Sequence, residues 1–229
     1  MKLLAIDTSG DDCSAALLID GAVRQRLTRE PRRHGALILG MMDGLLAEAG
    51  VPLAGLDGLA FGRGPGSFTG VRIAAAVVQG CAFGADLPVV GVSTLAALAQ
   101  GQRRLRGLSR VLAALDARMG EVYWGRFRCD ETGLMRLDGE EQVARAEDVI
   151  IPADAGWTGA GSGWGADGET LRSRLGGRLE RVDADAFCEA RDLALLAAAE
   201  LAAGRGLPAE RALPRYLRDR VTAAVGGVR

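Results

Sequence analysis

The segment KLLAIDTSGDDCSAALLIDGAVRQRLTRE, residues 2–30, contains three strand-like runs separated by two polar turns. The first run is apolar and ends at Asp7, and the Ser, Gly and Asp residues that follow it are typical of a turn. The second and third runs meet at Asp20-Gly21, a dipeptide that favours a two-residue hairpin turn. The segment therefore predicts a β-meander at the start of the domain.

Helices and strands alternate after this meander. The predicted elements, in chain order, are a helix at 34–49, a strand at 56–62, a helix at 71–84, a strand at 88–92 and a helix at 95–101. Ser67 or Thr69 can cap the second of these helices, and Ser93 and Thr94 can cap the third, because their hydroxyl groups accept from free backbone N–H groups.

The arginine-rich stretch at 102–110 is interpreted as the boundary between two lobes. A solvated loop is the other interpretation of this stretch, and the two are compatible. The division assigns residues 1–104 to a first lobe and residues 105–229 to a second, degenerate lobe with a basic tail. The 229 residues are enough for one large domain or two small lobes.

The second lobe is expected to begin as the first does, with a hairpin that carries an aspartate, here Asp116. A strand near Trp157–Ala160, a glycine-rich turn and a long helix over 186–203 follow. A meander followed by alternating helices and strands, found twice, predicts an α/β fold with mixed sheets flanked by helices. Two such lobes resemble the architecture of actin, sugar kinases and Hsp70.

The composition excludes several kinds of chemistry. Lys2 is the only lysine, so no Walker A lysine can follow a glycine loop and a Schiff-base lysine is not expected. His34 is the only histidine, which excludes zinc motifs that need two. The four cysteines are far apart and are typical of reduced thiols in a cytosolic protein. No metal or cofactor is expected, and no apolar run is judged long enough to span a membrane.

Three turns are candidate nucleotide-proximal segments. Kinases of this architecture wrap phosphates with a D-x-G-T/S turn, but here Ser9 stands where that glycine should follow Asp7. Asp116 lies in the corresponding turn of the second lobe. The stretch TGAGSGWG, which includes Gly161 and Gly163, lacks the G-x-G-x-x-G spacing of a dinucleotide site. All three segments are also compatible with purely structural turns.

The loop GRGPGSFTG at 62–70 precedes the helix at 71–84. The free N-terminus of that helix could bind an anion, with help from Arg63 and Arg72. The stretch holds neither a lysine nor a carboxylate for magnesium, so the loop is interpreted as a device that turns the chain.

The helices at 34–49 and 71–84 are apolar on more than one side, which predicts a protein–protein interface. Coverage by the lobe's own sheet and other helices is the alternative. A lone histidine at the start of the first helix is typical of a surface or capping residue. The candidate partner-binding residues are Leu37, Ile38, Met41, Met42, Leu45, Phe68, Val71, Arg72, Ala75 and Val78.

The motifs GRGPGSFTGVRI, GVSTL, RVLAALDARMGEVYW and PRYLR closely resemble the TsaB (YeaZ) family. The resemblance implies the two-lobed actin-like fold and a non-catalytic relative of TsaD, the enzyme that transfers a threonylcarbamoyl group to the adenosine beside the tRNA anticodon. It further implies pairing with TsaD through the first-lobe helices, a larger complex with the ATPase TsaE, and a homodimer. Contact with tRNA would come only through that complex.

The resemblance also implies that the metal centre belongs to TsaD, which holds it with two histidines one helical turn apart. Ile38 stands one turn after His34, so this chain cannot build that site. A small ATP-dependent phosphotransferase that uses Asp7 and Asp116 is the enzyme alternative, and a metalloprotease is a third. A cytoplasmic location is expected.

Overall fold

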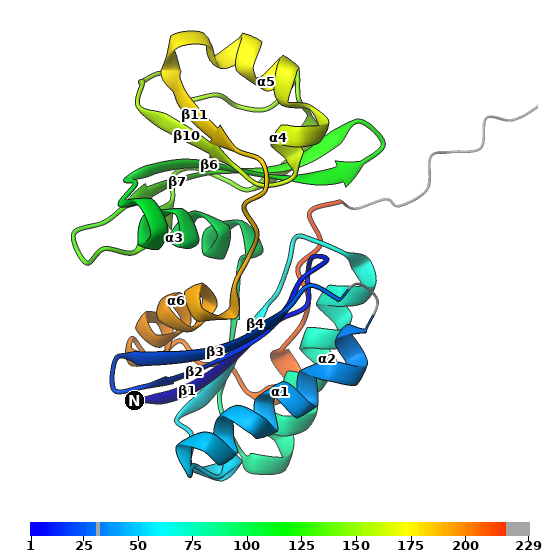
Figure 1. Cartoon of the computed structure of the whole chain (residues 1–229), viewed down its shortest axis with the longest axis vertical. Coiled ribbons are helices and arrows are strands. Elements are labelled where there is room, and N and C mark those ends of the chain that lie inside the picture. The colour runs from blue at the N-terminus through cyan, green and yellow to red at the C-terminus, as the bar shows by residue number, and fades with distance from the viewer. Residues whose placement is uncertain (31–32, 219–229) are drawn as a thin grey trace, which may run out of the picture.

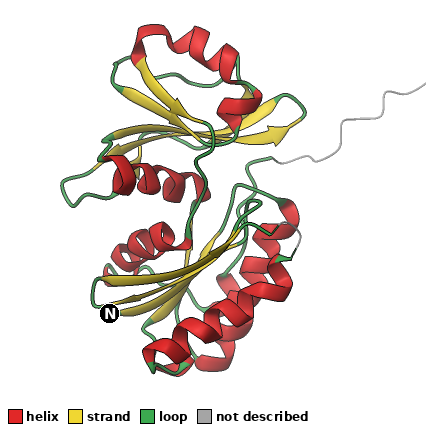
Figure 2. Cartoon of the chain, viewed as in Figure 1, coloured by secondary structure: helices red, strands yellow, loops and turns green. Residues whose placement is uncertain are grey.

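The computed structural model describes residues 1–30 and 33–218. These residues form two lobes, each built on one mixed β-sheet with helices on its faces (Figure 1; Figure 2). The strand order is β3-β2-β1-β4-β5 in the first sheet and β11-β10-β6-β7-β8 in the second, where β9 also pairs with β7. The predicted α/β class with mixed, helix-flanked sheets is confirmed.

The first sheet follows from the meander. Its strands are β1 (Lys2–Asp7), β2 (Cys13–Ile19), β3 (Ala22–Thr28), β4 (Gly58–Gly62) and β5 (Val89–Val92). Strands β1 to β3 are antiparallel, whereas β4 and β5 extend the sheet in parallel from β1. Asp20 and Gly21 both have positive φ angles, as a two-residue hairpin turn with right-handed strand twist requires.

Helices cover both faces of this sheet. The helices α1 (His34–Ala49) and α2 (Phe68–Ala85) pack on one face, and α6 (Ala190–Ala202) packs on the other (Figure 1). Alternate residues of β1 divide between these layers, Leu4 toward α1 and α2 and Leu3 toward α6. Helix α6, which comes from the part of the chain after residue 105, therefore helps to enclose the first sheet.

The second lobe is built on the longer hairpin. Its strands are β6 (Arg110–Arg118), β7 (Glu121–Cys129), β8 (Met135–Leu137), β9 (Gln142–Arg145), β10 (Trp157–Ala160) and β11 (Leu179–Asp183). Helix α3 (Thr94–Arg106) packs on one face, whereas α4 (Gly163–Ala166) and α5 (Gly168–Leu175) cover the other (Figure 1). Three buried tryptophans anchor this second core, namely Trp124, Trp157 and Trp164.

The two lobes meet where α3 packs against α6. Arg104 of α3 donates to both carboxylate oxygens of the buried Asp192 at 2.9 Å and to Glu189 at 2.7 Å. Bidentate pairing of this kind fixes both distance and orientation. The division of the chain at residue 104 stays a prediction. Three single-turn segments complete the described elements, η1 (Leu53–Gly55), η2 (Gly176–Arg178) and η3 (Ala209–Arg211).

The C-terminal segment returns to both lobes. Arg215 N donates to Arg63 O at 2.8 Å in the first lobe. Arg218 donates to Ala117 O at 3.1 Å and pairs with Glu121 in the second lobe. The basic tail predicted from sequence therefore contacts both lobes through Arg215 and Arg218, and its last residues, 219–229, lie outside the described part of the chain.

Helix α2 corrects one expectation. Its 18 residues have a mean hydropathy of 1.4, so it is long and apolar enough to cross a membrane by length and composition alone. The sequence expectation that no run reaches that length is therefore wrong. One side of α2 packs on the first sheet through Ala74, Val78 and Ala82.

Candidate functional site: the first turn, the glycine loop and the helical face

The glycine loop is shaped by direct contact with the first turn of the chain. Ser67 N donates to Ser9 O at 2.7 Å, and Thr8 Oγ1 donates to Gly70 O at 2.7 Å. A Cβ at Gly66 would lie 2.5 Å from Ser9 O, and a Cβ at Gly70 would overlap Thr8 O. These two glycines are therefore required because another backbone lies against them.

Asp7 lies in the same contact. Its side chain is 1% exposed, and a Cβ at Gly62 would overlap its Oδ1 atom. Ser9 Oγ donates to the two Asp7 carboxylate oxygens at 2.9 and 3.1 Å. Burial raises the pKa of Asp7 to about 6, against the opposing effect of the Ser9 hydrogen bonds. The turn that a kinase would use for phosphate here closes on the protein's own atoms.

Substitution of Asp7 by asparagine should stabilise the fold at neutral pH. Because the folded pKa of about 6 exceeds the ordinary aspartate pKa of 3.8, the native state binds the proton more tightly. The contribution of Asp7 to the free energy of unfolding is thus fully present below about pH 4 and is lost as the pH rises through 6. The amide is never charged, so Asp7→Asn should gain up to about 3 kcal/mol above pH 7.

Urea unfolding of both proteins from pH 4 to pH 8 measures this difference. The difference between the two curves isolates Asp7 from Asp12, whose pKa is also raised by burial. A stability gap that does not change with pH would contradict the assignment.

The candidate turn of the second lobe is held by local contacts. Asp116 Oδ1 accepts from Arg118 N at 2.7 Å, and Asp116 N donates to Ser162 Oγ at 3.1 Å. A Cβ at Gly161 or Gly163 would press on the backbone of Ala114. The structure therefore groups Asp116 with these two glycines in the second lobe, whereas Asp7 and Ser9 form a separate group in the first.

The predicted partner-binding residues divide by burial. Six of them lie in the chain's own core, namely Ile38, Met42, Leu45, Val71, Ala75 and Val78. Leu37 and Met41 are half-buried, and only Phe68 and Arg72 are exposed. The lobe's own sheet thus covers one side of each helix, as the sequence alternative allowed. A partner that binds this conformation of the chain would therefore contact the opposite side of the two helices.

That other side forms the helical face, defined as the exposed residues Leu39, Gly40, Ala76, Gly80, Phe83 and Gly84 of α1 and α2. Phe83 is 82% exposed and Leu39 is 49% exposed. A Cβ at any of its three glycines would meet nothing within 4 Å. Large apolar side chains therefore flank strips of bare backbone, to which another helix can pack closely.

The candidate partner-binding residues selected from the sequence include none of the residues of the helical face, although the sequence contains the pattern of that face. Ala76, Gly80 and Gly84 recur at every fourth position of α2, which places them on one side of a helix. Arg72 is the single charged residue of α2. A search for small residues at helical spacing would have found this strip, whereas the search for large apolar residues selected mainly the buried side.

A second exposed cluster adjoins the start of α2. Arg72 Nε donates to the Tyr216 hydroxyl at 2.8 Å, and the Arg72 guanidinium lies 3.5 Å from the centre of the Phe68 ring. The Phe68 and Tyr216 rings are 6.0 Å apart. Tyr216 comes from the C-terminal segment, so sequence spacing gave no indication that it joins residues 68 and 72.

Comparison with known proteins identifies the family of this chain. The family model described as "TsaD: tRNA N6-adenosine threonylcarbamoyltransferase" matches residues 28–156. The Escherichia coli (strain K12) protein named "tRNA threonylcarbamoyladenosine biosynthesis protein TsaB" is 42% identical over 224 residues, which cover 96% of each chain. The chain belongs to the TsaB family. A Haemophilus influenzae TsaB is 43% identical over 77% of this chain and 78% of its own.

Solved TsaB-family structures share the whole fold. "YeaZ from Pseudomonas aeruginosa" superposes with a TM-score of 0.88 at 49% identity, over 94% of this chain and 99% of that one. A second Pseudomonas aeruginosa structure, described as similar to "peptidase YEAZ", gives the same TM-score over 95% of this chain and 99% of that one. The family resemblance found in the sequence motifs is confirmed.

This TsaB-family chain has one histidine, His34. His34 is buried at the start of α1, and its Nε2 atom lies 3.1 Å from Asp11 O. Within residues 1–30 and 33–218, no three His, Cys, Asp or Glu residues gather as a metal site would need. His34 therefore has a structural contact inside the first lobe.

Proposed function

We propose that this chain acts in tRNA threonylcarbamoyladenosine biosynthesis as a non-catalytic partner that activates the TsaD transferase. Family membership supports the pathway, because curated relatives carry its name. The observation that carries the partner role is the helical face, where an 82% exposed phenylalanine and three open glycines lie on two adjacent helices. Exposed apolar surface of this kind marks docking sites.

The match to the TsaD family supports the choice of partner. The matched residues 28–156 include all of α1 and α2, so TsaD carries a segment related to the one that bears the helical face. Related surfaces can pair about an approximate two-fold axis, as identical ones do in symmetric dimers. The same face would serve a homodimer, and the two assemblies would then exclude each other.

Activation is a shift of TsaD toward its competent conformation, which requires that this chain bind that conformation more tightly. TsaE joins the larger assembly, and tRNA meets this chain only through it. The proposed location is the cytoplasm, where the four cysteines, all free thiols, stay reduced.

Reconstitution tests this function directly. The mixture contains TsaD, TsaE and TsaC, a separate enzyme of the pathway that makes threonylcarbamoyl-AMP. It should transfer the threonylcarbamoyl group to tRNA only when this chain is added, and the chain alone should hydrolyse no ATP. Nucleoside analysis of digested tRNA measures the product. Equal product without the chain would overturn the activator role.

The phosphotransferase alternative has its own readout. ATP turnover by the isolated chain that disappears with Asp116→Asn would support it. The contacts of both aspartates within their turns disfavour it, because each carboxylate already accepts hydrogen bonds from its own loop.

A further inference from the structure

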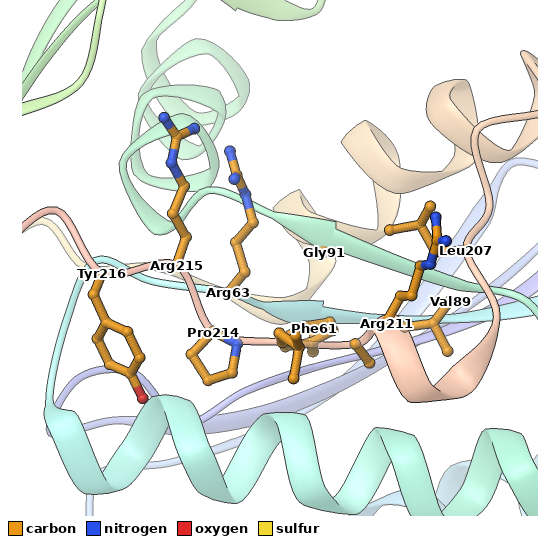
Figure 3. A pocket seen from close by; sticks show the side chains of 11 residues that line it. Phe61, Arg63, Val89, Gly91, Leu207, Arg211, Pro214, Arg215 and Tyr216 are labelled. Atoms are coloured by element: carbon orange, nitrogen blue, oxygen red, sulfur yellow. The ribbon is translucent and has the colours of Figure 1, made fainter.

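Arg63 and Arg215 form a pair of like charges at the end of strand β4. The 2.8 Å hydrogen bond from Arg215 N to Arg63 O makes the two residues backbone neighbours, although they lie far apart in the sequence. Figure 3 shows their side chains running in parallel, away from helix α2 and from the ring of Tyr216. Burial lowers the pKa of Arg63, and the positive charge of Arg215 lowers it further.

Neither guanidinium has a counter-ion among the residues that the structure describes. The ion pairs formed between residues 1–30 and 33–218 include neither arginine. Arg63 Nε is buried and has no hydrogen-bond partner in the described part of the chain. Buried donors are nearly always paired, so this atom marks a place where an acceptor is missing.

One carboxylate lies in the neighbourhood but is already engaged. Glu141 accepts a hydrogen bond from the hydroxyl of Ser93, the residue that caps helix α3. Its negative charge acts on Arg63 through space and opposes the lowering of that pKa. The N-terminus of helix α3 carries a partial positive charge, and the carboxylate of Glu141 offsets this charge. Glu141 thus acts on Arg63 only through space, and it forms an ion pair with neither arginine among the residues that the structure describes.

We propose that Arg63 and Arg215 bind a phosphate group, carried either by free phosphate or by a nucleotide. Guanidinium groups donate in a planar fork that matches phosphate oxygens, and two parallel forks can share one tetrahedral anion. A phosphate monoester carries a charge near −2 at neutral pH, enough to compensate both arginines, whereas one carboxylate would compensate only one. The site lies outside the helical face and needs no partner protein.

Calorimetric titration of the full chain tests the site with inorganic phosphate, pyrophosphate and ADP as probes, at constant ionic strength. We expect millimolar or tighter binding, weakened roughly tenfold or more by Arg63→Gln and by Arg215→Gln, because each removes a charge-assisted fork. Arg211→Gln is the matched control. Arg211 lies in the same C-terminal segment, but Figure 3 places its guanidinium at the other end of the pocket.

Thermal unfolding gives a second readout that separates binding from folding. In chloride, Arg215→Gln should unfold at a higher temperature than the unsubstituted chain, because the repulsion between the two charges is gone. In phosphate at the same ionic strength, only the unsubstituted chain and Arg211→Gln should be stabilised. Tighter binding of ADP than of phosphate would identify a nucleotide site, and equal binding a site for the phosphate group alone.

Two results would overturn the proposal. One is that the unsubstituted chain binds none of the three probes at millimolar concentration. The other is that Arg211→Gln weakens binding as much as the paired substitutions do, which would indicate general charge attraction. Neither result bears on activation of TsaD, since no readout here includes that protein.

Discussion

Replacement of Phe83 by glutamate should abolish activation of TsaD and leave the chain folded. Phe83 is 82% exposed, so the substitution removes almost no contact within the chain. In a complex, the new carboxylate would be buried on an apolar surface without a partner, which we expect to weaken pairing by about 3 kcal/mol, or roughly a hundredfold. Titration calorimetry with TsaD measures the affinity, and tRNA modification measures the consequence.

Leu105→Glu is the matched control for this substitution. Leu105 is 62% exposed on α3, away from the helical face, and the change in side chain is comparable. It should leave the affinity for TsaD unchanged. Loss of pairing with both variants would indicate a general effect of added charge, and retained pairing with Phe83→Glu would remove the helical face from the proposed interface. Leu45, which the sequence selected, is unsuitable because it is buried.

Gly70→Ala should be the most destabilising small substitution in the glycine loop. The added Cβ would overlap the carbonyl oxygen of Thr8, and this oxygen belongs to a backbone that cannot swing away as a flexible side chain would. The turn and the loop must then separate, which also strains the hydrogen bond from Thr8 Oγ1 to Gly70 O. We expect a loss of about 3 kcal/mol in the free energy of unfolding.

The same substitution ten residues later should have the opposite sign. Gly80 lies on the same helix with nothing within 4 Å of an added methyl group, and alanine is the better helix former by about 1 kcal/mol. Guanidinium unfolding of Gly70→Ala and Gly80→Ala side by side measures both effects. Equal effects of the two substitutions would show that the loop and the turn are not in contact.

The sequence predicted the elements of the fold better than their contacts. The hairpin at Asp20-Gly21 and the strand Trp157–Ala160 are confirmed, because turn chemistry and strand composition are local properties. Ser67, one of the two residues predicted to cap helix α2, accepts a hydrogen bond from Gly70 N at 3.3 Å. The helix predicted from residue 186 begins at Ala190, because Glu189 before it has an extended backbone conformation.

The sequence indicated that the glycine loop turns the chain, but its contact with the first turn was beyond sequence reasoning. Gly62, Gly66 and Gly70 lie just before a helix, as the glycines of a phosphate loop do, and their actual neighbours, residues 7–9, are about 60 positions away. Spacing along the chain cannot say whether a ligand or the protein's own backbone occupies the space beside a glycine. In the same way, apolar residues all round a helix do not reveal which side the protein itself covers.

The packing of α6 on the first sheet has a consequence for synthesis on the ribosome. The apolar side chains of Leu3, Ala5 and Leu18 are covered by helix residues 190–202, which are made more than 170 positions later. The strands of the first sheet are therefore complete while one of their faces still lacks its cover. Contacts of such long separation close slowly, and the uncovered face exposes the nascent chain to aggregation until α6 emerges.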